Sequence, residues 1–253
     1  MSNTSTLIIT GDKMQGFCIN SDILTITELL NLSKSQFQKK AEIYQCIFVT
    51  QGINQKQVAT ISERLEKLTI KPRLRLLDEM LNKEAKAFTH KLHHENVLIS
   101  KPKKIAEDKF QSQLLIDNGC DIISDHVTRQ HLQGMLIIES ARQSMISIIE
   151  NYYTEQTERF KRSFILKNID SNFLKLIFPL DVNILSKLSF HAQSNNYVNA
   201  TISSDFFQYD QLCATITINF IVMNTEKISK KEVTLLSDTL AKATRSSTDE
   251  KIL

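Results

Sequence analysis

The sequence has few cysteines and no long apolar run. Its 253 residues include four cysteines, and none shows the C-x-x-C spacing of a zinc knuckle. We therefore expect reduced thiols, with neither a zinc site nor a disulfide framework. No apolar run approaches the roughly 18 residues of a membrane span, and the N-terminus lacks the basic start and apolar core of a signal peptide. These absences predict a cytoplasmic protein that does not insert into a membrane.

Excess charge of one sign is also absent. The chain carries 31 Lys and Arg residues against 28 Asp and Glu residues, a net charge of +3. Because no basic block is interleaved with aromatic residues, nucleic acid is not an expected partner. His90, His93 and His94 lie close together in the sequence, but no carboxylate set with ligand spacing accompanies them. We expect no metal and no cofactor.

Residues 1–88 are expected to form a separate, small α/β region. Two runs typical of strands, residues 6–10 and 43–49, are followed by turn signals that contain glycine. Over residues 58–68, apolar side chains recur every three or four positions, which predicts an amphipathic helix. Pro72 is expected to open a further helix. Catalytic residue types do not gather here, so we expect a scaffold or dimer-supporting role.

Residues 89–228 show strand patterns around one long helix, expected over residues 132–153. Because this helix is apolar on nearly all sides, it should be buried, with a curved antiparallel sheet around it. Residues 229–253 should form a helix up to residue 243, followed by a loose tail. The expected strands cover residues 96–103, 109–116, 164–169, 173–191, 197–208 and 211–223, and the runs at 164–169 and 173–191 could form one bent strand.

The long helix carries three polar side chains on one face. Glu139, Arg142 and Gln143 stand at positions i, i+3 and i+4, and Met135 lies one turn earlier. Burying an unpaired carboxylate costs about 3 kcal/mol or more, so such a residue is a candidate for chemistry. A plainer interpretation stays open at this point. Glu139 and Arg142 could form an intrahelical ion pair whose charged ends reach water.

The polar loop before this helix carries further candidates, His126, Arg129 and His131. At the N-terminus of the helix that follows, free backbone N–H groups and the positive end of the helix dipole can face a carbonyl or a phosphate. Because histidine side chains titrate near pH 6.5, His126 can accept a proton without tuning. Glu139 would need a pKa raised by burial to do the same.

This segment resembles the core pattern of the A-factor biosynthesis (AfsA-type) hotdog family: Asp-His, a second His in a polar turn, Gly-Met, and Glu-x-x-Arg-Gln. Residues 93–99 and 176–181 are similar to two further motifs of the family, His-x-Glu-Asn-Val-Leu-Ile and Phe-Pro-Leu. The resemblance covers about residues 90–225 and implies an α+β hotdog fold, a long helix wrapped by a curved antiparallel sheet. The residues that match the core pattern are Asp125, His126, His131, Gly134, Met135, Glu139, Arg142 and Gln143.

One departure from the family concerns the number of hotdog copies. Signal-forming members typically carry two copies in one chain, whereas residues 1–88 lack the family's motifs. The resemblance therefore implies a single-repeat member with an extra N-terminal region. Because a lone hotdog generally completes its site across a two-fold axis, it also implies a homodimer.

The resemblance further implies acyl transfer. In the family, a β-ketoacyl group carried as a thioester on acyl carrier protein or CoA is joined to the hydroxyl of dihydroxyacetone phosphate, the first step toward butenolide and butyrolactone signals. Carried over to this chain, Glu139 or His126 would be the general base, and Arg142 would bind the acceptor's phosphate. Backbone N–H groups at the start of the helix would bind the oxyanion. The other expected substrate-binding residues are Gly134, Met135, Arg129, His131 and Gln143.

Two other functions compete with this one. A hotdog dehydratase or thioesterase would act on an acyl thioester without a phosphorylated acceptor, and so would need a His and Glu pair but no cation. Arg142 therefore distinguishes the two functions, because only the acyltransferase needs a cation for a phosphorylated acceptor. In a different class, a non-catalytic hotdog would bind an acyl ligand or a partner protein, and the polar face of its helix would be structural.

Overall fold

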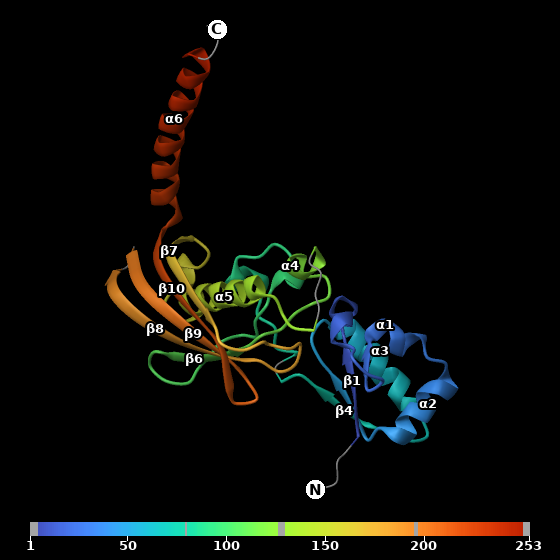
Figure 1. Ribbon diagram of the computed structural model, residues 1–253. Coiled ribbons are helices and arrows are strands. Elements are labelled where there is room, and N and C mark those ends of the chain that lie inside the picture. The colour runs from blue at the N-terminus through green and yellow to red at the C-terminus, as the bar shows by residue number, and fades with distance from the viewer. Residues whose placement is uncertain (1–4, 79, 126–129, 195–196, 250–253) are drawn as a thin grey trace.

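The computed structural model describes residues 5–78, 80–125, 130–194 and 197–249. Its strands form a four-stranded parallel sheet near the N-terminus and a six-stranded antiparallel sheet in the rest of the chain. Figure 1 shows the N-terminal unit to one side of the larger sheet. A long C-terminal helix, α6 (Thr225–Asp249), projects from the other side (Figure 1).

The N-terminal unit, β1 to β4, is the small α/β region that the sequence predicts. Its strand order is β2-β1-β3-β4. Its α-helices begin at capping boxes, in which Thr25, Ser33 and Asn54 each accept a hydrogen bond from the third helical residue. The elements are β1 (Thr6–Thr10), η1 (Asp12–Phe17), β2 (Ile23–Thr25), α1 (Ile26–Asn31), α2 (Lys34–Ile43), β3 (Cys46–Val49), α3 (Gln55–Glu66) and β4 (Arg73–Leu76).

Two predictions for this unit need correction. The segment after Pro72 is not a helix, because Arg73–Leu76 form β4 and pair in parallel with β3. Its apolar spacing fits a helix, but pairing with a neighbouring strand outweighs a local preference over so few residues. The strand predicted over residues 43–49 begins only at Cys46, because α2 continues to Ile43.

The second unit has the hotdog arrangement, with strand order β5-β6-β8-β9-β10-β7 and the long helix α5 against the sheet (Figure 1). Along β9 every second residue is buried, as expected for a strand with one face on the core. The strands are β5 (Lys103–Lys104), β6 (Lys109–Gln113), β7 (Arg162–Phe173), β8 (Asn183–Ser194), β9 (Tyr197–Gln208) and β10 (Gln211–Asn224). The helices are η2 (Lys86–Thr89), η3 (His94–Asn96), α4 (Asp121–Ser124), α5 (Gly134–Tyr152) and η4 (Gln156–Glu158).

The predicted strand over residues 96–103 is largely replaced by other structure. It contains the end of η3 and isolated bridges, such as the one between Ile99 and Leu114, before the short β5 begins. The possible bent strand is also absent. β7 and β8 are separate strands, and the side chain of Gln208 holds the connection between them by hydrogen bonds with both backbone groups of Phe178.

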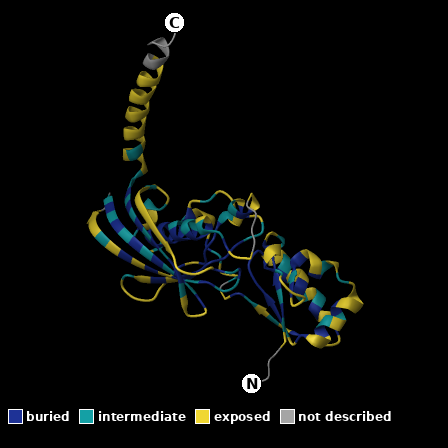
Figure 2. Ribbon diagram, viewed as in Figure 1, coloured by how far each residue is buried: buried dark blue, intermediate teal, exposed yellow. Residues whose placement is uncertain are grey.

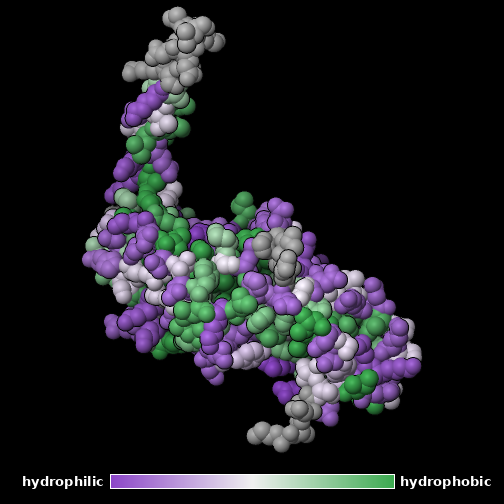
Figure 3. Space-filling model, viewed as in Figure 1, coloured by the Kyte–Doolittle hydropathy of each residue, from purple (hydrophilic) through white to green (hydrophobic). Residues whose placement is uncertain are grey.

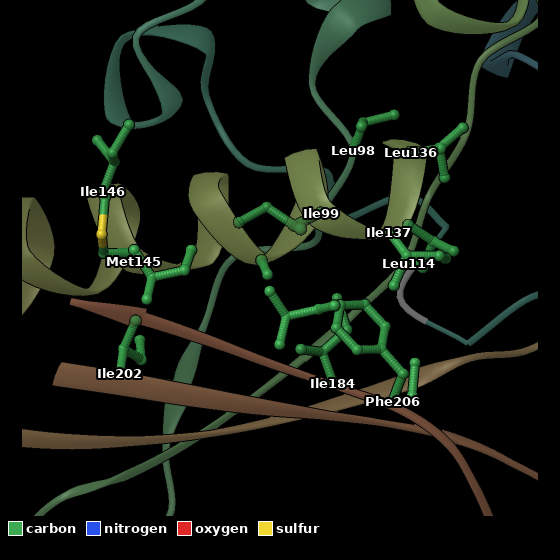
Figure 4. Packing of buried hydrophobic residues seen from close by; sticks show 14 of the residues in the cluster. Leu98, Ile99, Leu114, Leu136, Ile137, Met145, Ile146, Ile184, Ile202 and Phe206 are labelled. Carbon is green, nitrogen blue, oxygen red and sulfur yellow. The ribbon is translucent and has the colours of Figure 1, made fainter. Parts of the chain in front are cut away.

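Helix α5 is buried, as its apolar composition predicts. Met145 and Ile146 of α5 have no exposed surface, and Ile184, Ile202 and Phe206 on the neighbouring strands are also fully buried. Figure 4 shows Ile184, Ile202 and Phe206 between the strands and the helix, whereas Ile146 points away from the strands. The colouring by burial shows the same pattern, with dark blue along α5 and alternating colours on the strands (Figure 2). The sheet therefore wraps the helix, and any polar group on α5 must be paired or reach a solvent opening.

The two units meet through buried backbone contacts. The side chain of Gln51 donates from Nε2 to the carbonyl of Leu114 over 2.8 Å, and its Oε1 accepts from the N–H of Ile116 over 2.7 Å. The next residue, Gly52, has φ +82° and lies so close to Gly11 that a Cβ on Gly11 would be 2.5 Å from the Gly52 carbonyl oxygen. Only glycine fits this approach.

Helix α6 is longer than predicted. The predicted helix ends at residue 243 and a tail follows, but α6 starts directly after β10 and continues to Asp249. Residues 225–249 contain neither glycine nor proline, so nothing in the chain interrupts the helix. Its hydrophobic side chains are exposed, Val233 to 63% and Leu236 to 57% (Figure 3). Among the described residues, no helix is both long and apolar enough to cross a membrane.

Candidate active site

Glu139 is the centre of a charged cluster on α5. Arg142 binds its carboxylate with two hydrogen bonds, Nε to Oε2 at 2.7 Å and Nη2 to Oε1 at 2.8 Å. Lys91 Nζ lies 2.7 Å from Oε1, and Gln143 Nε2 donates to the same oxygen over 3.0 Å. The helical spacing predicts that Glu139, Arg142 and Gln143 share one face, and it leaves an ion pair of Glu139 with Arg142 open. Lys91 comes from the segment between η2 and η3.

These contacts determine the protonation of Glu139. Burial raises the pKa of its carboxyl group, but the hydrogen bonds and charge of Arg142, with hydrogen bonds from Lys91 and Gln143, lower it to about 2. In turn, the hydrogen bond to Glu139 raises the pKa of Arg142 above its ordinary value. A carboxylate with so low a pKa is a weak proton acceptor at neutral pH. The raised pKa that a Glu139 general base requires is therefore absent.

The cluster is open to solvent at one side. The side chains of Glu139, Lys91 and Arg142 keep 17%, 23% and 26% of their surface exposed. The intrahelical ion pair that the sequence left open is thus formed, but most of its surface is covered. A ligand can still reach the exposed part of the two cations.

Gln143 lies behind this cluster and is fully buried. Its Nε2 donates to the carbonyl of Asn96 over 2.8 Å as well as to Glu139, and its Oε1 accepts from the N–H of Leu98 over 2.8 Å. Gln143 has no exposed surface in this structure, and its role as a substrate contact stays a prediction. It holds the carboxylate of Glu139 against the segment after η3.

The start of α5 is only partly described. His126 and Arg129 lie outside the described residues. His131 is exposed, and Met135 is 63% exposed at the first turn. The N-cap residue Gln133 makes no side-chain hydrogen bond to that turn, because its Nε2 donates to the carbonyl of Ile122. The first N–H groups of α5 are therefore not capped by that side chain.

Gly134 sits where the chain comes close to an aromatic ring. A Cβ at this position would lie 3.0 Å from the Phe173 ring at the end of β7. This proximity brings the edge strand of the sheet up to the start of α5.

Lys91 is the functional candidate that sequence reasoning missed. Its position is fixed by the preceding residue, His90, which adopts a left-handed conformation at φ +52°. The His90 ring nitrogen Nε2 lies 3.4 Å from Oε1 of Glu150, a fully buried residue of α5. The loop is thus attached to α5 at two points, by His90 to Glu150 and by Lys91 to Glu139. No periodic pattern in the sequence connects Lys91 with Glu139.

Glu84 is another buried carboxylate near α5, and no sequence pattern singles it out. It accepts hydrogen bonds from Ser147 Oγ at 2.6 Å and from Asn151 Nδ2 at 3.0 Å. These partners satisfy the carboxylate inside the core. Within the described part of the chain, no group of three or more His, Cys, Asp or Glu side chains is arranged to hold a metal ion.

The family model of the A-factor biosynthesis hotdog domain matches residues 75–224, which is more than half of the chain. The chain belongs to this family. The matched region of this AfsA-type protein contains Lys91, Glu139, Arg142 and Gln143, and it begins within β4. Almost all of the N-terminal α/β unit therefore precedes the family domain.

Solved structures with some similarity include a thioesterase from Haemophilus influenzae, with 17% identity over 50% of this chain and 79% of that chain and a TM-score of 0.34. A mutant thioesterase from Pseudomonas aeruginosa has 11% identity, covers 50% of this chain and 81% of that chain, and has a TM-score of 0.36. A conserved protein from the same organism has 11% identity over 55% and 100% of the two chains and a TM-score of 0.38. The search of curated proteins found no match. The family assignment rests on the sequence match.

Proposed function

We propose that this AfsA-type hotdog protein is an acyltransferase that joins a β-ketoacyl group, carried on acyl carrier protein or CoA, to the hydroxyl of dihydroxyacetone phosphate. Such a reaction would serve the synthesis of a butenolide or butyrolactone signal. The donor carriers are cytoplasmic thioesters, so we expect the protein to act in the cytoplasm.

The charge balance around Glu139 is the observation that carries this proposal. Lys91 and Arg142 bring two positive charges to a single carboxylate, so the cluster keeps a net charge of +1. Both cations are partly exposed. A phosphate-bearing acceptor would supply the missing negative charge and could accept hydrogen bonds from both side chains. Hydrolysis or dehydration of a thioester needs no such cations.

The acceptor hydroxyl oxygen attacks the thioester carbonyl carbon, and its proton passes to a base. The carbon–sulfur bond then breaks, and the thiolate leaves and takes up a proton. We assign the base to His126, since the low pKa of Glu139 disfavours it. This assignment rests on the family pattern, because His126 lies outside the described residues. Arg129 in the same loop stays a proposed phosphate contact.

The oxyanion of the tetrahedral intermediate needs hydrogen-bond donors. We propose the backbone N–H groups of Gly134 and Met135, at the positive end of the α5 dipole. The absence of a side-chain cap from Gln133 supports this role. The exposed His131 and Met135 are expected to contact the acyl donor at the same opening.

A homodimer is part of the proposal, and strand β7 supports it. β7 has 12 residues and stands at the edge of the sheet, paired with β10 on one side only. Ile165, Leu166 and Ile169 on this strand are 39%, 40% and 37% exposed. A long edge strand with exposed apolar residues favours pairing with a second copy. Because Phe173 at its end covers Gly134, the partner would lie near the start of α5.

The test is to incubate the protein with β-ketoacyl thioesters, with and without dihydroxyacetone phosphate, and to follow thiol release and product mass. We expect thiol release to depend on the phosphate acceptor and to yield an ester of the combined mass. Equal thiol release without the acceptor, giving the free acid, would identify a thioesterase. Loss of water from a β-hydroxyacyl thioester supplied in parallel would identify a dehydratase, and binding without turnover would identify a non-catalytic acyl-binding protein.

A further inference from the structure

A cavity of about 350 Å³ lies between the N-terminal unit and the hotdog unit. One wall is the β3–α3 loop and the first turn of α3, from Gln51 to Val58. The opposite wall consists of three groups of residues: Met80, Leu81 and Lys83; His94 and Glu95 of η3; and Leu115, Ile116 and Asp117. The residues of the Glu139 cluster do not line it. Because the first wall precedes residue 75, the cavity is not contained in the matched family domain.

The position of this cavity is one where α/β units commonly bind small molecules. β3 and β4 are parallel, and their carboxyl ends both lead into segments that line the cavity. Ligands of open parallel sheets bind outside the carboxyl ends of the strands. The volume falls at the lower end of the usual range of ligand pockets, about 300 to 1000 Å³.

Lys83 is a cation in the cavity wall that an anionic ligand would stabilise. It is half-buried in the cavity wall, and burial lowers the pKa of its ammonium group despite the nearby charges of Asp117 and Glu95. Within the described part of the chain, it has neither an ion pair nor a side-chain hydrogen bond. A desolvated cation without a direct partner is stabilised by an anion placed beside it.

The neighbours of Lys83 narrow the chemistry of that anion. Burial and the charge of Lys83 lower the pKa of His94, so its imidazole is neutral at neutral pH and can both donate and accept a hydrogen bond. Glu95 and Asp117 line the same end and accept hydrogen bonds. The lining carries Lys56 as a second cation. Its apolar part comprises Ile53, Val58, Met80, Leu81, Leu115 and Ile116.

We propose that this cavity binds a small organic anion that carries one phosphate or carboxylate group and at least one hydroxyl group. The anionic group pairs with Lys83 and Lys56, and the hydroxyl groups donate to Glu95 or Asp117. The carbon skeleton lies on the apolar wall. The two lysines and two carboxylates of the lining balance in charge, and Asp117 already accepts a hydrogen bond from the N–H of Gly119 over 2.9 Å. Hydroxyl groups that donate to the carboxylates would offset their repulsion of the anionic group.

This site is separate from the proposed active site but adjacent to it. Glu95 lines the cavity, and the next residue, Asn96, accepts the hydrogen bond of Gln143 that also holds Glu139. The proposal does not depend on acyl transfer, because binding can be measured without any thioester.

The test is calorimetric titration of the full chain with three probes: inorganic phosphate, glycerol 3-phosphate and lactate. We expect saturable binding of one hydroxylated probe, tighter than that of inorganic phosphate. Comparing glycerol 3-phosphate with lactate shows whether the cavity prefers a phosphate or a carboxylate as the anionic group. In Lys83→Gln the affinity should fall about tenfold or more, as for loss of a charge-assisted contact. Lys39→Gln, which changes an exposed lysine of α2, should bind as the wild type does.

A second measurement uses the unmodified chain and so does not depend on the folding of a variant. Brief acetylation at neutral pH should label Lys83 faster than Lys39, and the bound probe should protect Lys83 alone, as followed by peptide mass spectrometry. The proposal is overturned if no hydroxylated probe binds saturably, if Lys39→Gln weakens binding as much as Lys83→Gln, or if the probe leaves labelling of Lys83 unchanged.

Discussion

Lys91 Nζ and Arg142 Nη2 both contact the same oxygen of Glu139, at 2.7 Å and 2.8 Å. One cation comes from a loop before the sheet and the other from the buried helix, so the carboxylate joins two segments that are distant in sequence. The arrangement keeps Glu139 ionised and leaves one positive charge unmatched. In the proposed reaction, the two cations would bind the anionic acceptor, and a residue other than Glu139 would accept its proton.

The first prediction concerns the base. His126→Ala should lower kcat about a hundredfold or more, as is usual for the loss of a general base. The wild-type rate should rise with pH near 6.5, where histidine side chains titrate, and Glu139→Gln should retain that rise even if its rate is lower. Steady-state kinetics between pH 5 and pH 9 measure both. A rise that disappears in Glu139→Gln but persists in His126→Ala would transfer the role to Glu139.

The second prediction links the pKa of Glu139 to stability. Its pKa of about 2 in the folded state lies below the ordinary value of 4.5, so this group stabilises the fold above about pH 4.5. That contribution is lost as the pH falls from about 4.5 to about 2. Melting temperatures of the wild type should therefore fall more steeply over this interval than those of Glu139→Gln. Parallel curves for the two proteins would mean that the ion pairs around Glu139 do not persist in solution.

The third prediction concerns Lys91, which no sequence pattern indicated. Lys91→Met should raise the KM for dihydroxyacetone phosphate about tenfold, because one charge-assisted contact with the phosphate is lost. The KM for the acyl thioester should change little. Lys39→Gln serves as the control for a general change in charge. If Lys91→Met leaves the acceptor KM unchanged, then Lys91 only neutralises Glu139.

The fourth prediction concerns the edge strand. Ile169→Lys should convert a homodimer into a monomer, since a charge in the middle of β7 opposes pairing with a second copy. Leu236→Lys is the matched control, because this exposed apolar residue lies on α6. Sedimentation equilibrium gives the mass of each variant. Dissociation by Leu236→Lys alone would place the dimer contact on α6.

The elements that the sequence predicts well are those with a long and regular pattern. α5 differs from its predicted range by a residue or two at each end, and β9 was predicted with its bounds, because a buried helix and an alternating strand each repeat over many residues. The apolar spacing after Pro72 predicts a helix where β4 lies, because four residues do not distinguish the two periods. Strand β2 and helices α1 and α2 are short, and their residues show no apolar period that distinguishes them from the neighbouring turns.

In the candidate site, too, local relations are predictable from the sequence and contacts between distant segments are not. The spacing of Glu139, Arg142 and Gln143 placed them on one face of the helix, because that relation is local. Lys91 could not be found, since its contact depends on how a loop folds back onto α5. The direction of the pKa shift was equally hidden. Burial alone raises the pKa of Glu139, and only the observed contacts reverse the sign.

Arg142→Ala tests the central claim most directly, because Arg142 is expected to recognise the acceptor's phosphate. Its kinetics should be measured with dihydroxyacetone phosphate and with dihydroxyacetone, alongside the melting temperature. The loss of a contact worth about 1.5 to 3 kcal/mol should raise the KM for the phosphorylated acceptor about ten- to a hundredfold. The reaction with dihydroxyacetone and the thioester KM should be nearly unchanged, and Arg142→Lys should recover only part of the loss. Equal losses with both acceptors, together with a large fall in melting temperature, would show that Arg142 is only the structural partner of Glu139.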